Sequence, residues 1–125
     1  MKTVITAAGA PAAIGPYSHA VASDNLFFTS GQIALDPTTG KLVGNTIEAQ
    51  TEQVLKNLEA VLAANNMTFA NVIKTTVFLV DLADFAVVNE IYASRFSENP
   101  PARSCVQVAG LPGGSKIEIE LIACK

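Results

Sequence analysis

The spacing of apolar residues is most regular over Thr46–Asn65, where it predicts an amphipathic helix. Asn45 or Thr46 can cap the start of this helix, because either side chain can accept a hydrogen bond from a free backbone N–H. The pair Asn65-Asn66 can supply the left-handed residue that ends it. The apolar positions recur at i, i+1, i+4, i+7 and i+8 and form one stripe: Val54, Leu55, Leu58, Val61 and Leu62.

A β-branched segment, Asn71–Val80, follows this helix, and both of its faces are largely apolar. Such a strand is covered on two sides in the folded protein. Asp81 or Asp84 is expected to cap a second helix, and Pro100-Pro101 stops it. The residues expected on the inner face of that helix are Phe85, Val88, Ile91 or Tyr92, and Phe96.

Four further segments have the composition of strands and are bounded by turn residues. They are Tyr17–Ala22, Asn25–Ser30, Arg103–Ala109 and Lys116–Cys124. The element order ββαβαββ predicts a single α+β domain over residues 1–125, with two helices on one face of a mixed sheet. The other face of the sheet must then be solvated or buried against another subunit.

The composition favours burial against another subunit. Hydrophobic residues make up 50% of the chain and charged residues only 15%, which is apolar for so small a protein. The net charge is −3 and the basic residues are scattered, so no basic stripe is available for a nucleic acid. No apolar run could span a membrane, and Met1–Ala13 is too short and interrupted for a signal peptide. Cys105 and Cys124 are too few for a disulfide framework, which favours free thiols in the cytoplasm.

The last two strands carry the residues best suited to chemistry. Arg103, Cys105 and Gln107 alternate onto one face of their strand, and Glu118 and Glu120 onto one face of theirs. If the two strands close into a hairpin, all five side chains share one surface. An arginine fork can bind a carboxylate, and a partly desolvated Glu can exchange a proton with water. The surface could therefore bind a small carboxylate that water attacks, or its charges could form ordinary surface ion pairs.

Three other features leave alternatives open. Cys105 could be a nucleophile, or a strand residue that contributes only its backbone. Gly31, within Ser30-Gly31-Gln32, could let the backbone approach a ligand, or it could mark a β-bulge. His19 is the only histidine, and without an evident partner it is expected at the surface or on a rim. No set of residues has the spacing of a metal site.

Six blocks of the chain, taken in order, point to one family. The two most specific are Pro101-Ala102-Arg103-Ser104-Cys105-Val106 and Ile117-Glu118-Ile119-Glu120. The other four are Ala12–Ser18, Thr29–Ile33, Val72–Leu79, and Asp84-Phe85 with Val88-Asn89 and Tyr92. Along nearly its whole length the chain therefore resembles the RidA family, also called the YjgF family, of reactive intermediate/imine deaminases.

This resemblance implies a fold and an activity. The fold would be a six-stranded mixed sheet with two helices on one face, like that of chorismate mutase, in a homotrimer whose sheets form a central barrel. The activity would be hydrolysis of reactive enamines and imines, such as 2-aminoacrylate, to 2-keto acids and ammonia, as in a 2-iminobutanoate/2-iminopropanoate deaminase. It would take place in clefts between subunits, on a small substrate with a carboxylate, without a metal or another cofactor.

The resemblance also implies roles for individual residues. Arg103 would bind the substrate carboxylate, and Glu118 would position the attacking water and manage its proton. The backbone of Cys105 would hold that water or the imine nitrogen. An imine is already electrophilic, so positioning of this kind can suffice without a nucleophilic side chain. The residues expected to line the cleft and orient the substrate are Tyr17, Ser30, Gly31 and Asn89.

Two other functions stay open at the level of the sequence. Some relatives carry names that imply endoribonuclease activity or inhibition of translation, but the acidic charge argues against RNA as the main ligand. A non-catalytic trimer that binds small carboxylates or partner proteins, as a sensor or chaperone, would use the same cleft. The presence of Arg103 and Glu118 together favours catalysis, because binding alone needs only the arginine.

Overall fold

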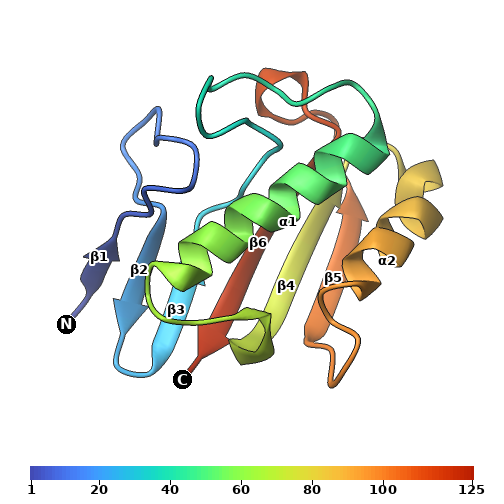
Figure 1. Ribbon diagram of the computed structural model, residues 1–125. Helices are drawn as coiled ribbons and strands as arrows, with labels where there is room; N and C mark the ends of the chain where they lie inside the picture. The colour runs from blue at the N-terminus through green and yellow to red at the C-terminus, as the bar shows by residue number, and fades with distance from the viewer.

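The computed structural model describes residues 1–125, which form a six-stranded mixed sheet with both helices packed on one face (Figure 1). The strands lie in the order β1-β2-β3-β6-β4-β5, and only the neighbours β4 and β5 run parallel. The predicted α+β fold with a mixed sheet is thus confirmed. The strands are β1 (Thr3–Ile5), β2 (Ala20–Ser23), β3 (Leu26–Thr29), β4 (Val72–Leu79), β5 (Ala102–Gln107) and β6 (Ile117–Cys124).

The first helix, α1 (Ile47–Ala63), follows the predicted pattern. Thr46 is its N-cap, and its Oγ1 accepts a hydrogen bond from the Ala49 N–H at 3.2 Å. Just after the helix, Asn66 has a φ of 57°, the left-handed conformation predicted for this position. All five residues of the apolar stripe are buried against the sheet, and these are Val54, Leu55, Leu58, Val61 and Leu62.

The second helix, α2 (Phe85–Ala93), follows a short 3-10 turn, η2 (Leu82–Asp84). Asp81 caps this turn through a 2.9 Å bond from the Ala83 N–H, whereas Asp84 makes no capping bond with its side chain. Val88, Tyr92 and Phe96 are buried as predicted. Phe85 was expected beside them but is 39% exposed, because it lies at the edge of the sheet against Arg103.

The element order differs from the prediction in one strand. The three-residue strand β1 pairs with β2 at the other edge of the sheet, so the observed order is βββαβαββ. So short a strand offers too few positions for an alternating pattern to be recognised. Two other short 3-10 turns, η1 (Phe69–Asn71) and η3 (Pro112–Gly114), lie in the connections.

The predicted hairpin of the last two strands is wrong. β4 lies between β5 and β6 and pairs with both of them. The connection from β5 to β6 crosses the end of β4, where the Val108 N–H bonds to the Leu79 carbonyl and the Val80 N–H to the Lys116 carbonyl. The central position buries β4, whose apolar residues gain a partner strand on each side.

Insertion of β4 changes which side chains share a face. Arg103 pairs with Thr75, and Glu118 pairs with Phe78. Thr75 and Phe78 lie an odd number of positions apart on one regular stretch of β4, so their side chains point to opposite faces. Arg103 therefore lies on the face covered by the helices and Glu118 on the open face. The prediction that both groups line one surface of the chain is wrong.

The open face carries exposed apolar side chains as well as Glu118. Val4, Leu26, Phe28 and Val106 project from it and are between 39% and 53% exposed. Several exposed apolar side chains on one face are a common mark of a protein–protein contact. Neither helix combines the length and the apolar character needed to cross a membrane.

Candidate functional site

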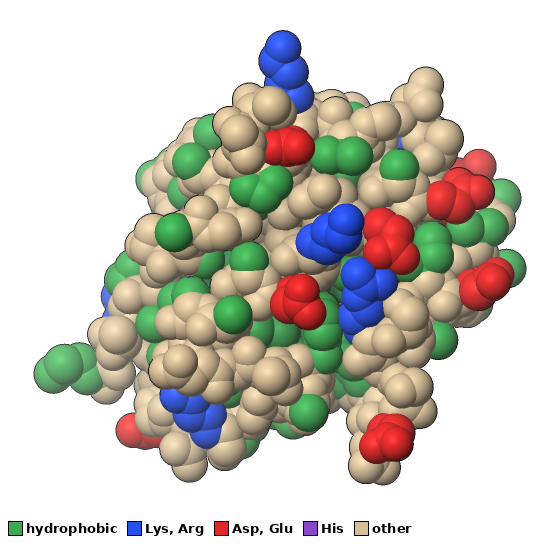
Figure 2. Space-filling model, in the orientation of Figure 1, with side chains coloured by type: hydrophobic (Ala, Val, Ile, Leu, Met, Phe, Trp, Pro, Cys, Tyr) green, Lys and Arg blue, Asp and Glu red, His purple; other side chains and the backbone are tan.

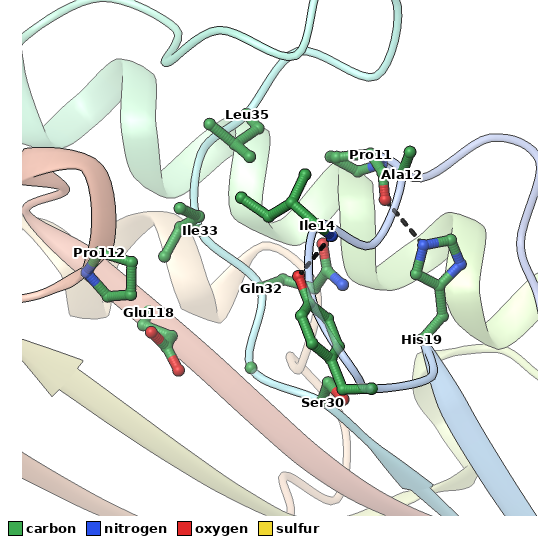
Figure 3. Close-up of a pocket in the computed structure, with 12 residues that line it drawn as sticks. Pro11, Ala12, Ile14, His19, Ser30, Gln32, Ile33, Leu35, Pro112 and Glu118 are labelled. Atoms are coloured by element: carbon green, nitrogen blue, oxygen red, sulfur yellow. Dashed lines mark hydrogen bonds between the residues drawn. The ribbon is translucent and has the colours of Figure 1, made fainter.

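A cleft of about 370 Å³ lies beside β6, and Glu118 forms part of its wall (Figure 3). The N-terminal loop with Pro11, Ala12 and Ile14 forms one side, and Glu118 and Pro112 form the other. The segment that follows β3 runs between the two sides. The residues of this segment that line the cleft are Ser30, Gly31, Gln32, Ile33 and Leu35.

Local hydrogen bonds hold this segment against the rest of the fold. The backbones of Gln32 and Ile119 exchange two hydrogen bonds, of 2.8 and 3.1 Å, so the segment runs antiparallel to β6. The buried side chain of Asn57 on α1 donates to the carbonyls of Ile33 and Leu35 at 3.1 and 3.0 Å. The segment between the two sides of the cleft is therefore bonded to both β6 and α1.

Gly31 makes room for the Glu118 carboxyl. A Cβ at Gly31 would lie 2.7 Å from Cδ of Glu118 and closer still to its Oε2, which is nearer than real Cβ atoms come. The φ of Gly31 is not positive, so the absence of a side chain here serves the close approach rather than a turn. Between the Phe28–Ile122 pair and the Gln32–Ile119 bridge, the Gly31 side has one residue more than β6, as in a β-bulge. The group that comes close to the Gly31 backbone is the Glu118 side chain of the same chain.

The Glu118 carboxyl is half-buried and has no basic partner in the chain. The single ion pair in the structure joins Arg95 to Glu52, at 3.0 Å. Burial raises the pKa of Glu118 above its usual range, and the nearby carboxylate of Glu120 raises it further. A carboxyl group with a raised pKa is better suited than an ordinary surface Glu to accept a proton and return it. The reading of Glu118 as part of an ordinary surface ion pair is excluded within the chain.

Tyr17 and Ser30 lie in the cleft with Glu118, as the resemblance implied. Ser30 Oγ donates to the Ser18 carbonyl at 2.6 Å, which ties the N-terminal loop to the end of β3. The hydroxyl of Tyr17 accepts a hydrogen bond of 3.4 Å from the Ile14 N–H, and its side chain remains 48% exposed. Both residues thus offer polar groups to the cleft.

His19 is buried, which contradicts an exposed place at the surface, although it is among the residues that line the cleft. Its Nδ1 accepts from the Ala7 N–H at 2.9 Å, so its Nε2 is the atom that donates to the Pro11 carbonyl, at 2.7 Å. The imidazole is therefore neutral and clamps the N-terminal loop. Sequence reasoning missed this role because both partners are backbone groups, which no side-chain pattern reveals.

Arg103 lies on the other face of the sheet, against α2. Its Cζ lies 4.9 Å from the centroid of the Tyr92 ring and 5.4 Å from that of Phe85. Helical spacing places Asn89 between these two aromatic residues, on the side of α2 that faces Arg103. No acidic side chain pairs with Arg103. Its N–H donors are thus available to an anion from outside the chain.

The Cys105 thiol is a poor nucleophile, but the backbone N–H and C=O of Cys105 have no partner strand. Burial raises the pKa of its thiol, and the opposing effect of Arg103 is smaller, so the thiol stays protonated at neutral pH. β5 is an edge strand, and the Val108 N–H points inward to β4. Because backbone groups alternate in direction along a strand, those of Cys105 and Arg103 point outward from the edge.

The predicted residues therefore form two groups. Glu118, Tyr17, Ser30 and Gly31 meet in the cleft beside β6, whereas Arg103, Cys105 and Asn89 lie at the β5 edge on the helix-covered face. Nowhere in the structure do three His, Cys, Asp or Glu side chains gather as metal ligands would.

Comparison with known proteins places the chain in a family. Residues 7–125 match the family described as Endoribonuclease L-PSP. A relative from Arabidopsis thaliana, named Reactive Intermediate Deaminase A, chloroplastic, is 54% identical over 122 residues. The chain belongs to this RidA family. The match covers 98% of the chain and 65% of the Arabidopsis protein, so the chain spans about two thirds of that relative.

Other RidA-family members match over almost their full lengths. A human protein named 2-iminobutanoate/2-iminopropanoate deaminase is 50% identical, with 98% of this chain and 90% of the relative covered. Among solved structures, a putative endoribonuclease from Thermotoga maritima superimposes with a TM-score of 0.97 at 50% identity, covering 100% of this chain and 98% of that one. The structure of E. coli TdcF with bound serine gives a TM-score of 0.94 at 42% identity, with 98% of each chain covered.

Proposed function

We propose that this chain hydrolyses reactive enamines and imines, such as 2-aminoacrylate, to 2-keto acids and ammonia. The observation that carries the proposal is the half-buried Glu118 carboxyl, with a raised pKa and no basic partner, on the wall of a cleft. The deaminase names of the human and Arabidopsis relatives support the same reaction. The bound serine in E. coli TdcF supports a small ligand with a carboxylate.

The complete site forms between two protomers of a homotrimer. Within one chain Arg103 and Glu118 point to opposite faces, so they can act on one small substrate only if the β5 edge of one protomer reaches the cleft of its neighbour. The exposed apolar residues of the open face, such as Phe28 and Val106, give the protomers a surface to bury. Three equivalent clefts follow from threefold symmetry, around a central barrel of sheets.

In this site Arg103 binds the substrate carboxylate through its free N–H donors. The Glu118 carboxylate orients a water molecule and takes its proton as the oxygen adds to the imine carbon. The proton returns to the nitrogen and gives a carbinolamine, the enamine having first tautomerised to the imine. Glu118 then moves the carbinolamine hydroxyl proton to the amine, so that the C–N bond breaks, ammonia leaves and the carbonyl forms. The outward backbone of Cys105 holds the water or the nitrogen, and Tyr17, Ser30, Gly31 and Asn89 orient the substrate.

A coupled assay tests this function. A pyridoxal-phosphate dehydratase acting on serine supplies 2-aminoacrylate, and pyruvate is measured with and without the purified protein. The expected result is faster formation of pyruvate than the spontaneous rate, in proportion to the protein added. A rate that stays at the spontaneous value would contradict the proposal. We also propose a cytoplasmic location, which the two free cysteines fit.

The family description raises endoribonuclease activity as a second candidate. On the helix-covered face, basic side chains lie scattered among acidic ones and form no stripe that could follow a phosphate backbone (Figure 2). The pI near 5.0 also disfavours RNA binding. Incubation of highly purified protein with RNA decides the matter: cleavage that Arg103→Ala abolishes would favour the ribonuclease, and cleavage that further purification removes would not.

A further inference from the structure

Two aromatic rings of α2 hold Arg103, and no acidic group does. Its Cζ lies 4.9 Å from the ring centroid of Tyr92 and 5.4 Å from that of Phe85. An aromatic face attracts the flat side of a guanidinium and leaves the N–H donors at its edge free. A carboxylate partner would instead have occupied those donors. The rings therefore hold the arginine without blocking the groups that bind an anion.

The Tyr92 ring is itself fixed in place. Its hydroxyl shares a 2.7 Å hydrogen bond with the buried Thr75 Oγ1, and its ring packs against Phe96 with centroids 4.5 Å apart. Burial raises the pKa of the Tyr92 hydroxyl, against the smaller lowering effects of Thr75 and Arg103. The hydroxyl thus stays protonated at neutral pH, and Tyr92 presents a neutral ring to the guanidinium.

We infer that Phe85 and Tyr92 are positioning residues, which hold the face of the Arg103 guanidinium so that its edge is set for the substrate carboxylate. The inference rests on the proposed role of Arg103 as the carboxylate anchor. An arginine that is already ordered loses less side-chain freedom when the substrate binds. The rings therefore strengthen binding of the carboxylate and leave the chemical step unchanged.

Phe85 is the better residue to test, because its side chain is 39% exposed and its replacement leaves no deep cavity. Phe85→Leu keeps an apolar side chain but removes the aromatic face. We expect it to raise KM for the imine, and Kd for the keto acid 2-oxobutanoate, about three- to five-fold with kcat unchanged. Phe85→Tyr keeps an aromatic ring and should have the wild-type KM and Kd. Both variants should keep the wild-type melting temperature.

A folded Phe85→Leu protein with wild-type KM and Kd would overturn the inference and leave the proposed deamination intact. A lower kcat at unchanged KM would also overturn it, because Phe85 would then act in the chemical step. If the wild-type protein binds 2-oxobutanoate but does not hydrolyse imines, the proposed function fails, and the Kd values still decide the role of the rings. A wild-type protein that neither hydrolyses imines nor binds 2-oxobutanoate would overturn both.

Discussion

Arg103 and Glu118 point to opposite faces of one sheet, on strands that flank β4. Arg103 pairs with Thr75 on the side of the helices, and Glu118 pairs with Phe78 on the open side. A guanidinium and a carboxyl group placed this way cannot contact the same small molecule within one chain. The chemistry proposed for this protein therefore depends on assembly, and each residue's contribution can be tested separately.

Loss of the Arg103 guanidinium should remove the carboxylate anchor. We expect Arg103→Ala to lower kcat/KM for the imine about 100-fold or more, since a charge-assisted bidentate contact contributes roughly 3 kcal/mol. Arg95→Ala is the matched control, because Arg95 forms a partly exposed ion pair with Glu52 away from the cleft. The dehydratase-coupled assay compares the two. Equal rates for the two variants would exclude Arg103 as the anchor.

The carboxyl group of Glu118 should matter for the reaction but not for stability. Glu118→Gln is expected to lower kcat about 100-fold or more, as loss of a proton-transfer group usually does. The raised pKa means that the folded state holds the Glu118 proton more tightly than the unfolded chain. The contribution of Glu118 to the free energy of unfolding is therefore greatest at low pH. It falls as the pH rises from the pKa of Glu118 in the unfolded chain to its higher pKa in the folded protein. At neutral pH the variant should melt at an equal or higher temperature, and a clear fall in Tm would argue for a structural carboxylate.

The pH dependence of the reaction should respond to Glu120. If ionised Glu118 takes the proton of water, kcat/KM rises with pH through the Glu118 pKa, which burial and Glu120 both raise. Glu120→Gln removes the charge that adds to the effect of burial, so the acidic limb of the pH–rate profile should move to lower pH. Burial should still keep the pKa of Glu118 above the usual range for Glu. Glu59→Gln, an exposed change on α1, is the control. A limb that does not move in Glu120→Gln would show that another group controls it.

Gly31 provides a test of the space around Glu118. Gly31→Ala should displace the Glu118 carboxyl, since the added Cβ would lie 2.7 Å from Cδ of that side chain. We expect a loss of about tenfold or more in kcat with little change in Tm, because a small misplacement of a catalytic group is costly and the displaced group is a flexible side chain. At Gly110 an added Cβ meets nothing within 4 Å, so Gly110→Ala should behave like the wild type. Retained activity in Gly31→Ala would mean that the position of the carboxyl is not critical.

The parts of the fold set by local signals were predicted from the sequence. The stripe of α1, its Thr46 cap and the left-handed Asn66 all depend on residues close together in the chain. The pairing of β5 and β6 could not be predicted this way. Both strands alternate and only a short loop joins them, so a hairpin fits the local pattern. The hairpin does not form because the apolar strand β4 is buried between β5 and β6 at the centre of the sheet. This is a long-range effect, which a local pattern does not show.

The candidate site was also predicted only in part from the sequence. Residue types and spacing indicated Arg103, Glu118 and Glu120 as groups suited to chemistry, and the resemblance selected Glu118. The resemblance also supplied Tyr17, Ser30 and Gly31, which the structure brings to the cleft with Glu118. The face that each strand presents depends on register with β4, which the sequence pattern does not specify. Helical spacing predicts both rings near Arg103 for the core, which holds for Tyr92 but not for Phe85, because the spacing does not show where the sheet ends.

The central claim, that one site takes Arg103 from one protomer and Glu118 from another, can be measured by mixing two inactive variants. Arg103→Ala and Glu118→Gln chains, co-expressed with different tags and purified as mixed assemblies, should regain activity that neither has alone. Whichever variant supplies two of the three chains, one cleft in a mixed trimer combines an intact arginine with an intact carboxyl group, so about a third of wild-type activity is expected. Mixed assemblies no more active than either variant, or a wild-type protein that is a monomer in solution, would contradict this account.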